Sequence, residues 1–320
     1  MSRSVSRPIV VFAVIAALAA VGLCGGWLLY SAMVKTKNAP QQILQGIPEQ
    51  DKEFYAELNR MAEKETAAAV SAYITERTRQ EPRLMAAALD WAADNSVGQQ
   101  DQQKLNAFYF MLYSDLAYLA AQAFKLQGME STYQDLSKTA FASLLTFDLL
   151  TATDALRCTD KTARELRAPL VKPRYIMLDY VFDLMTYEQM QKLFMAILRS
   201  ESALGNRAPN RELCAGGSEG KLAMLEAPGT RQEKVEIPDQ PGTMRTILIP
   251  AEDYHYEPGL ITQVEWLGAR EKMQNAVRDS WFQRQINYAN RLAAEKRREE
   301  ARQKGEPAEQ PAPAPETTVE

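Results

Sequence analysis

The sequence predicts a mainly α-helical protein with one N-terminal transmembrane helix and a helical-bundle-like extracytoplasmic domain. An uncharged run of 27 residues lies near the N-terminus, and apolar residues recur at three- and four-residue steps over much of the rest. Apolar residues make up 46% of the chain and charged residues 24%, which is the balance of a folded protein. We also expect a small β-hairpin or loop insertion and a long C-terminal helix.

The uncharged run covers residues 8–34 and predicts a membrane-spanning helix. About 20 apolar residues cross the hydrocarbon core of a bilayer, so the run is long enough to span it with some tilt. A cleaved signal peptide is the alternative, but its apolar part normally covers only about 7–15 residues. Arg3 and Arg7 precede the run without any acid, and positive charge favours the cytoplasmic side. We therefore expect residues 1–7 to form a cytoplasmic arm in a single-pass protein of the inner (cytoplasmic) membrane, with its C-terminal domain periplasmic or extracytoplasmic.

The residues that follow predict a short linker and then a helical domain. Two prolines and a glycine in residues 35–48 indicate the linker, and helical spacing of apolar residues extends over residues 49–204. Gly128 is expected to end the most regular helix. The apolar stripe of that helix consists of Leu105, Phe108, Tyr109, Leu112, Leu116, Leu119, Ala123 and Leu126.

The second half of the helical domain is expected to contain the centre of the core. Residues 141–150 are apolar on several faces of their helix, which is typical of a central position. Pro169 and Pro173 predict a break in the helical structure. Helices should then run from about Arg174 to Leu204, with an interruption near Thr186.

The C-terminal part of the sequence changes character. Residues 205–257 are rich in Gly and Pro and contain two short strand-like runs, at 234–237 and 244–249, so we expect a small hairpin or an ordered loop. A long C-terminal helix is expected over residues 258–304. Residues 305–320 are acidic and Pro-rich and predict a disordered tail.

Cysteine usage is compatible with export of the domain. Cys24 falls in the uncharged run, so Cys158 and Cys214 are the two cysteines outside it. An oxidising compartment would allow them to form a single disulfide. The alternative is two unrelated buried thiols, which are common in protein cores.

Several functional classes lose their usual support. The formal net charge of −4 argues against a general nucleic-acid binder. The sequence contains no phosphate-binding loop, dinucleotide fingerprint, zinc-protease motif or nucleophile elbow, and we expect no cofactor and no metal. Asp253, His255 and Glu257 would share one face of a strand, but an exposed polar segment is the preferred interpretation of this pattern.

Four acids lie among large apolar residues and are candidates for acid/base chemistry, namely Asp115, Asp148, Asp179 and Asp183. Paired carboxylates can perform such chemistry when burial separates their pKa values. The alternative is that each acid pairs with a basic residue inside the bundle, since buried charges need partners. The candidate partners are Arg157, Arg164, Arg167 and Arg174.

Residues 197–208, ILRSESALGNRA, resemble the helix end of lytic transglycosylases, where a Glu-Ser pair precedes a short Asn/Pro-x-Ala stretch. The resemblance implies that Glu201, followed by Ser202, is the general acid/base that cleaves the glycan strands of peptidoglycan. The spacing to Ala208 is one residue longer than in that family. The family's Gly-Leu-Met-Gln and Ala-Tyr-Asn elements are absent, and the match covers about a dozen of the 320 residues.

The preferred interpretation is therefore a protein without a catalytic site, acting through protein–protein interaction. It would be an accessory or scaffolding subunit of a cell-envelope complex, with other envelope or membrane proteins as partners and with oligomerisation possible. The alternative is a peptidoglycan-cleaving, lytic transglycosylase-like enzyme that uses Glu201. Neither interpretation involves nucleic acid.

Overall fold

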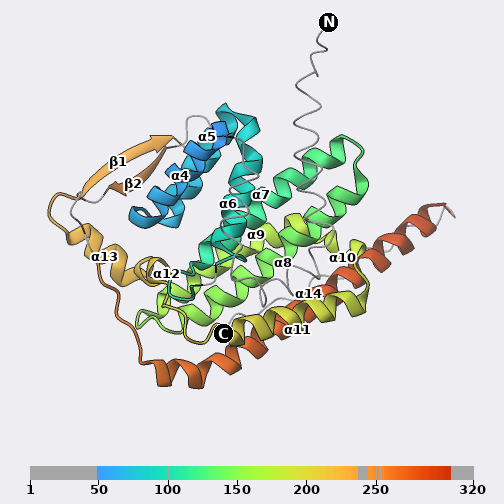
Figure 1. Cartoon of the computed structure of the whole chain (residues 1–320). Helices are drawn as coiled ribbons and strands as arrows, with labels where there is room; N and C mark the ends of the chain where they lie inside the picture. The colour runs from blue at the N-terminus through green and yellow to red at the C-terminus, as the bar shows by residue number, and fades with distance from the viewer. Residues whose placement is uncertain are drawn as a thin grey trace, which may run out of the picture. The chain divides into compact units, whose positions relative to one another are not determined.

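The computed structural model describes residues 49–99, 101–236, 244–249, 251, 254 and 256–303. It confirms a mainly α-helical chain (Figure 1). The chain divides into two compact units, one extending to Val277 and the other beginning at Arg278. The expected cytoplasmic arm at 1–7, the transmembrane helix at 8–34, the linker at 35–48 and the tail at 305–320 lie outside the described residues. Within the described ranges, no helix combines the length and the hydropathy that a membrane span needs.

The first unit begins with a group of helices that bury aromatic side chains between them. Thr66 separates the first two helices because its side chain accepts a hydrogen bond from Ala69 N at 3.2 Å and caps the second helix. Trp91 is fully buried, and its Nε1 donates to Asn59 Oδ1 at 2.8 Å, which ties α6 to α4. These elements are α4 (Glu49–Lys64), α5 (Ala67–Gln80), the 3₁₀ helix η1 (Pro82–Leu84) and α6 (Met85–Asn95).

Helices α7 (Ala107–Leu126) and α8 (Glu130–Ala155) form a hairpin that runs through the first unit (Figure 1). Gly128 adopts a positive φ of 73° in the turn, so the predicted stop is confirmed. The C-terminal half of α8 is almost entirely buried, because α7 and four helices that follow α8 in the chain all pack against it. The predicted central position of residues 141–150 is confirmed.

The predicted stripe of α7 is wrong over the last turns of the helix. Leu119, Ala123 and Leu126 are exposed, and Leu126 has 90% of its surface accessible. The residues that α7 buries there are Ala121 and Phe124. Both faces of this helix are apolar, so spacing alone could not show which face packs against the core.

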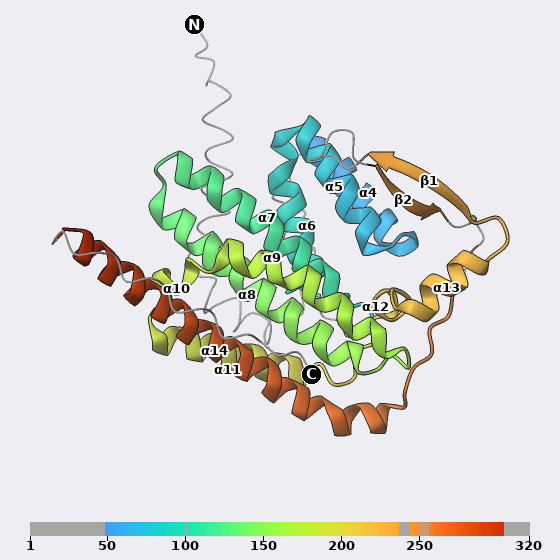
Figure 2. The ribbon, with the colours of Figure 1, turned by 180° about the vertical axis from the view of Figure 1, so that it is seen from behind.

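Helices α9 (Arg167–Leu178) and α11 (Tyr187–Ala203) pack against α8 (Figure 2). Helix α9 contradicts the break that its two prolines predicted. Pro169 is in the first turn of α9, where backbone N–H groups have no partner inside the helix, and Pro173 is accommodated within the helix. Thr186 does interrupt the helices, as predicted, and it forms a capping box with Gln189 at the start of α11. The elements are η2 (Lys161–Leu166), α9 (Arg167–Leu178), α10 (Val181–Leu184) and α11 (Tyr187–Ala203).

The Gly/Pro-rich stretch contains the predicted hairpin and two short helices that were not predicted. Strand β1 (Arg231–Glu236) pairs antiparallel with β2 (Met244–Ile249), in a register that places Arg231 opposite Ile249. Helices α12 (Arg211–Ala215) and α13 (Ser218–Glu226) precede the hairpin. Five and nine residues are too few for apolar spacing to reveal a helix.

The predicted long C-terminal helix is α14 (Gln263–Gln303). Its residues up to Val277 belong to the first unit, and the residues from Arg278 make up the described part of the second. The helix starts later than predicted because Leu260 forms an isolated antiparallel β-bridge with Cys158. Residues 258–262 are therefore not helical, and they lead into α14 from the disulfide region.

Candidate functional site

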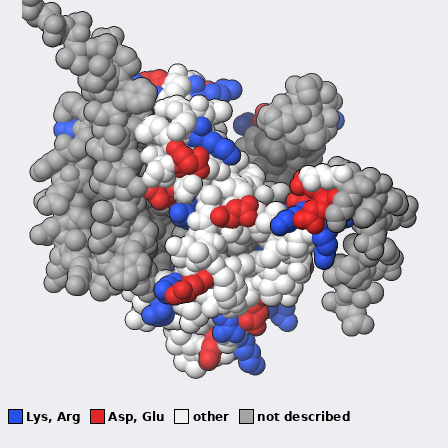
Figure 3. All heavy atoms as spheres, turned by 90° about the vertical axis from the view of Figure 1, so that its right-hand side faces the viewer, with Lys and Arg blue, Asp and Glu red and all other residues white. Residues whose placement is uncertain are grey.

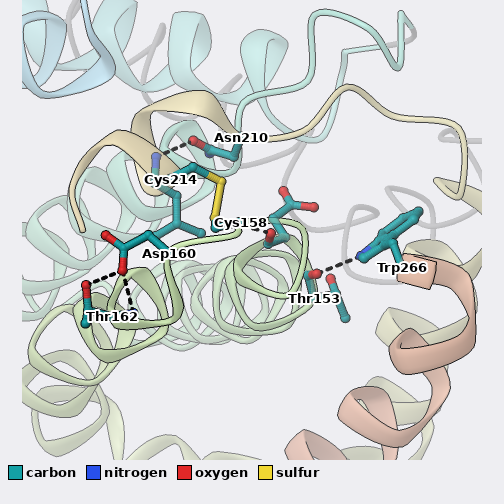
Figure 4. The surroundings of a disulfide bond; sticks show 9 residues. Thr153, Cys158, Asp160, Thr162, Asn210, Cys214 and Trp266 are labelled. Atoms are coloured by element: carbon teal, nitrogen blue, oxygen red, sulfur yellow. Dashed lines mark hydrogen bonds between the residues drawn. A yellow bond between two sulfur atoms is a disulfide. The ribbon is translucent and has the colours of Figure 1, made fainter. Parts of the chain in front are cut away.

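The structure joins Cys158 to Cys214, so the predicted disulfide is confirmed (Figure 4). Cys158 follows the end of α8 and Cys214 lies on α12, with their Cα atoms 5.2 Å apart. Asn210 caps α12 by accepting a hydrogen bond from Leu213 N at 2.9 Å, which fixes the backbone beside Cys214. The disulfide therefore fastens the short helix α12 to the end of the central helix.

The same region of backbone holds the segment that enters α14. Thr159 N donates to Gly259 O at 3.0 Å, and Ile261 N donates to Arg157 O at 2.8 Å, on either side of the bridge at Cys158. Trp266, in the first turn of α14, donates from Nε1 to Thr153 O at 2.7 Å (Figure 4). The disulfide and the start of α14 are thus built onto the same end of α8.

Glu201, the residue singled out by the transglycosylase resemblance, lies at the centre of a buried polar cluster. It is in the last turn of α11 and only 1% exposed. Its carboxylate accepts hydrogen bonds from Thr153 Oγ1 at 3.0 Å, Arg207 Nη1 at 2.8 Å and Arg270 Nε at 3.0 Å. Gln274 also donates to it. These four donors surround the Glu201 carboxylate, and the two arginines among them carry positive charge.

Arg207 links Glu201 to a second buried acid. Its guanidinium lies 2.7 Å from Asp154 Oδ1 in addition to its contact with Glu201. The guanidinium carbons of Arg157, Arg207 and Arg270 lie 4.5, 5.2 and 4.9 Å from the centre of the Trp266 ring. Cations over an indole face are attracted by its negative π surface. We call Asp154, Arg157, Glu201, Arg207, Trp266 and Arg270 the Trp266 cluster.

The two acids of the Trp266 cluster have pKa values shifted in opposite directions. Burial acts to raise the pKa of Glu201, but Arg207, Arg270 and Gln274 outweigh it, so the pKa lies below its ordinary value. Burial dominates at Asp154 and raises its pKa, although Arg207 opposes the shift. Glu201 is therefore ionised at neutral pH and has no proton to give.

The cluster is closed to a polymeric substrate. A general acid must reach the leaving oxygen of its substrate within hydrogen-bond distance, and the carboxylates of Glu201 and Asp154 are covered by the side chains that bind them. A groove of about 520 Å³ runs along the start of α14, but no acid lines it. Its lining consists of Leu156, Gly268, Ala269, Lys272, Met273 and Ala276. The geometry is that of a structural charge network.

Two of the predicted acid–arginine pairs are present. Arg174 makes a two-pronged contact with Asp115, at 2.7 Å from Nε and 2.6 Å from Nη2. Arg167 Nε lies 2.6 Å from Asp148 Oδ1, and Tyr175 also donates to Asp148. Both pairs join α9 to the α7–α8 hairpin. Asp179 directly follows the last residue of α9, and Asp183 lies in α10, so the two acids do not belong to one helix.

A pair of acids that sequence reasoning missed lies on α6. Asp90 and Asp94 are one helical turn apart and partly buried, and Tyr55 of α4 donates to Asp94. Burial raises the pKa of Asp90 to about 7, with a contribution from Asp94, and burial also raises the pKa of Asp94. No basic residue lies within ion-pair distance of either acid in the described chain. The signal available in the sequence was an Asp-x₃-Asp spacing with no base one turn away.

The alternating acidic segment is only partly described. Asp253 and His255 lie outside the described residues, and Glu257 forms an ion pair with Arg211. Within the described ranges, no group of three or more His, Cys, Asp or Glu residues is placed to hold a metal ion.

Comparison with known proteins adds no family to this description. No family model, no curated protein and no solved structure matches the chain.

Proposed function

We propose that this chain is a membrane-anchored, extracytoplasmic accessory or scaffolding subunit of a cell-envelope complex, which acts by binding other proteins. The observation that carries the proposal is the state of Glu201. The one acid with a catalytic precedent is buried, ionised and held by two arginines, which suits a structural role better than proton transfer.

Anchoring and export have separate support. The uncharged run at residues 8–34 has the length of a membrane span. The Cys158–Cys214 disulfide favours an oxidising compartment, because cytosolic thiols are normally kept reduced. Together they favour a domain held on the outer side of the inner membrane.

Binding has support from the outer surface of the first unit. Large apolar side chains that the core leaves exposed include Leu119, Leu126, Ile176, Met177, Tyr187, Met195, Leu222 and Leu225. They come from α7, α9, α11 and α13, so more than one helix offers apolar contact area. On the face shown in Figure 3, basic and acidic side chains are interspersed among uncharged surface, which suits protein contacts better than a polyanion.

A cleavage assay with purified peptidoglycan separates the proposal from the enzymatic alternative. We expect the purified full-length chain to release no muropeptides, and Glu201→Gln to change nothing in that assay. Glu188→Gln is the matched control, because Glu188 is an exposed acid on the same helix. Muropeptide release that Glu201→Gln abolishes and Glu188→Gln preserves would contradict the proposal and establish the lytic transglycosylase-like enzyme instead.

A further inference from the structure

The two sides of α9 differ in composition, and packing against the core accounts only for the inner side. Its inner side buries Val171, Tyr175 and Leu178. Arg167 and Arg174, which flank that inner side, are neutralised by Asp148 and Asp115. The opposite side is exposed along the whole helix and carries Ala168, Pro169, Lys172, Pro173, Ile176 and Met177.

The exposed side combines apolar surface with positive charge. Ile176 and Met177 are 66% and 42% exposed. Lys172 lies one turn before Ile176, and Lys161 and Arg164 are exposed on η2 immediately before α9. We call Lys161, Arg164 and the exposed residues of α9 the α9 face.

The charge of the α9 face is opposite to that of the whole chain. Residues 161–178 contain five basic residues and one acid, Glu165, whereas the chain carries a net charge of −4. Two of the five are neutralised by Asp148 and Asp115, so three exposed cations stand against the one exposed acid. No ion pair involves Lys161, Arg164 or Lys172 within the described ranges. These three cations are therefore available to an external anionic surface.

We infer that the α9 face docks on the anionic lipid surface of the membrane that holds the anchor. The inference rests on the proposed anchoring. The linker at residues 35–48 spans at most about 50 Å when fully extended, so the domain stays within reach of the bilayer. Basic residues beside exposed apolar side chains match the boundary between anionic headgroups and acyl chains. The apolar end at Ile176 and Met177 would enter that boundary while Lys161, Arg164 and Lys172 contact headgroups.

The test uses the full-length chain in nanodiscs of phosphatidylcholine, with or without phosphatidylglycerol. In a Cys24→Ala background, Ile176→Cys carries an environment-sensitive fluorophore while the Cys158–Cys214 disulfide stays intact. A nitroxide on the lipid headgroup region quenches the label when the two are in contact. Leu119→Cys is the matched control label, because Leu119 is 52% exposed on α7.

We expect the label at position 176 to be quenched in discs that contain phosphatidylglycerol, and the label at position 119 to remain unquenched. Each Lys or Arg near an anionic surface favours binding by about fivefold. Reversal of all three, with Lys161→Glu, Arg164→Glu and Lys172→Glu, should therefore weaken docking by a hundredfold or more. Reversal of three other exposed lysines changes the net charge equally and should preserve quenching, namely Lys104→Glu, Lys221→Glu and Lys234→Glu.

Each remaining result would overturn the inference. An unquenched label at position 176 in anionic discs that contain the protein would contradict the docking face alone. Equal quenching at positions 176 and 119 would show an unspecific approach to the bilayer. A response at position 176 only after an acidic protein is added would assign the face to a protein partner. A chain that does not co-elute with the discs would contradict the anchor itself.

Discussion

Asp90 shows how a single side chain can make the stability of this domain depend on pH. Its carboxylate has Asp94 one turn away on α6, Tyr55 facing it from α4 and Tyr113 facing it from α7. None of these groups supplies a positive charge. Ionisation is therefore unfavourable in the folded protein.

We predict that Asp90→Asn stabilises the protein at pH 8 and changes little near pH 4. The folded pKa is about 7, against an ordinary value of 3.8, so the folded state binds more protons than the unfolded state between these values. The free energy of unfolding of the wild type thus falls as pH rises from about 4 to 7. Because Asp90 is partly exposed, we expect a gain of about 1–3 kcal/mol at pH 8.

Chemical denaturation of the detergent-solubilised chain across this pH range measures the effect. Glu233→Gln is the control, because Glu233 is an exposed acid on β1. It should keep the wild-type pH dependence. A wild-type slope retained by Asp90→Asn would show that Asp90 is not the group that titrates.

Glu201 gives the second prediction at the residue scale. Glu201→Gln keeps the shape of the side chain but leaves Arg207 and Arg270 buried with less negative charge around them. Breaking a buried ion pair from one side costs roughly 3–5 kcal/mol. We expect a loss near the lower end of that range, since Asp154 still pairs with Arg207. Glu188→Gln should leave the denaturation midpoint unchanged, and an equally small effect of Glu201→Gln would rule out a structural role.

From the sequence we could predict that the buried acids need basic partners, but we could identify only some of those partners. Asp115 and Asp148 pair with two of the four arginines named in advance. The Trp266 cluster could not be assembled in advance. Arg270 comes from α14, 69 residues away from Glu201, and Arg207, although only six residues away, reaches Glu201 through the conformation of the loop after α11. The local sequence pattern drew attention to Glu201, whereas the folded structure is needed to see which cations contact its carboxylate.

At the scale of elements, the disulfide lies where several helices and connecting segments meet. It fastens α12 to the end of α8, and the residues on either side of Cys158 hold the segment that leads into α14. The short α12 also presents Glu212, which accepts hydrogen bonds from Ala67 N at 3.0 Å and Asn106 Nδ2 at 2.9 Å. Through this residue α12 contacts the start of α5 and the cap of α7.

We predict that Cys214→Ala lowers the free energy of unfolding by about 2–5 kcal/mol, as expected for loss of a native disulfide. Denaturation of the oxidised wild type, the reduced wild type and the variant measures this. The reduced wild type and Cys214→Ala should behave alike, and Cys24→Ala should match the oxidised wild type. Equal midpoints for the oxidised and reduced wild type would contradict a stabilising disulfide.

The elements themselves were predictable where local pattern and packing agree. The core residues of α8 and the Gly128 stop belong to this class. The expected break in α9 failed because burial of Val171 and Tyr175, together with the Arg174–Asp115 pair, keeps the helix intact across Pro173. The face of α7 that packs was also undetermined, since large apolar residues lie on both of its faces.

At the scale of the whole molecule, we propose that an anchor and a linker hold a domain whose buried ionisable groups stabilise the fold. The Cys158–Cys214 disulfide favours a compartment outside the reducing cytoplasm, and the proposed anchor would hold the domain there. The exposed apolar side chains of α7, α9, α11 and α13 are the surfaces for which we propose other envelope proteins and the membrane as partners.

Reporter fusions at the C-terminus test the central claim, an anchored domain on the extracytoplasmic side, most directly. We predict that an alkaline phosphatase fusion is active, because that enzyme folds only in an oxidising compartment, and that the matched fusion to a cytoplasmic fluorescent reporter is dark. Both fusions should fractionate with membranes. A dark phosphatase fusion with a bright cytoplasmic reporter would contradict the account.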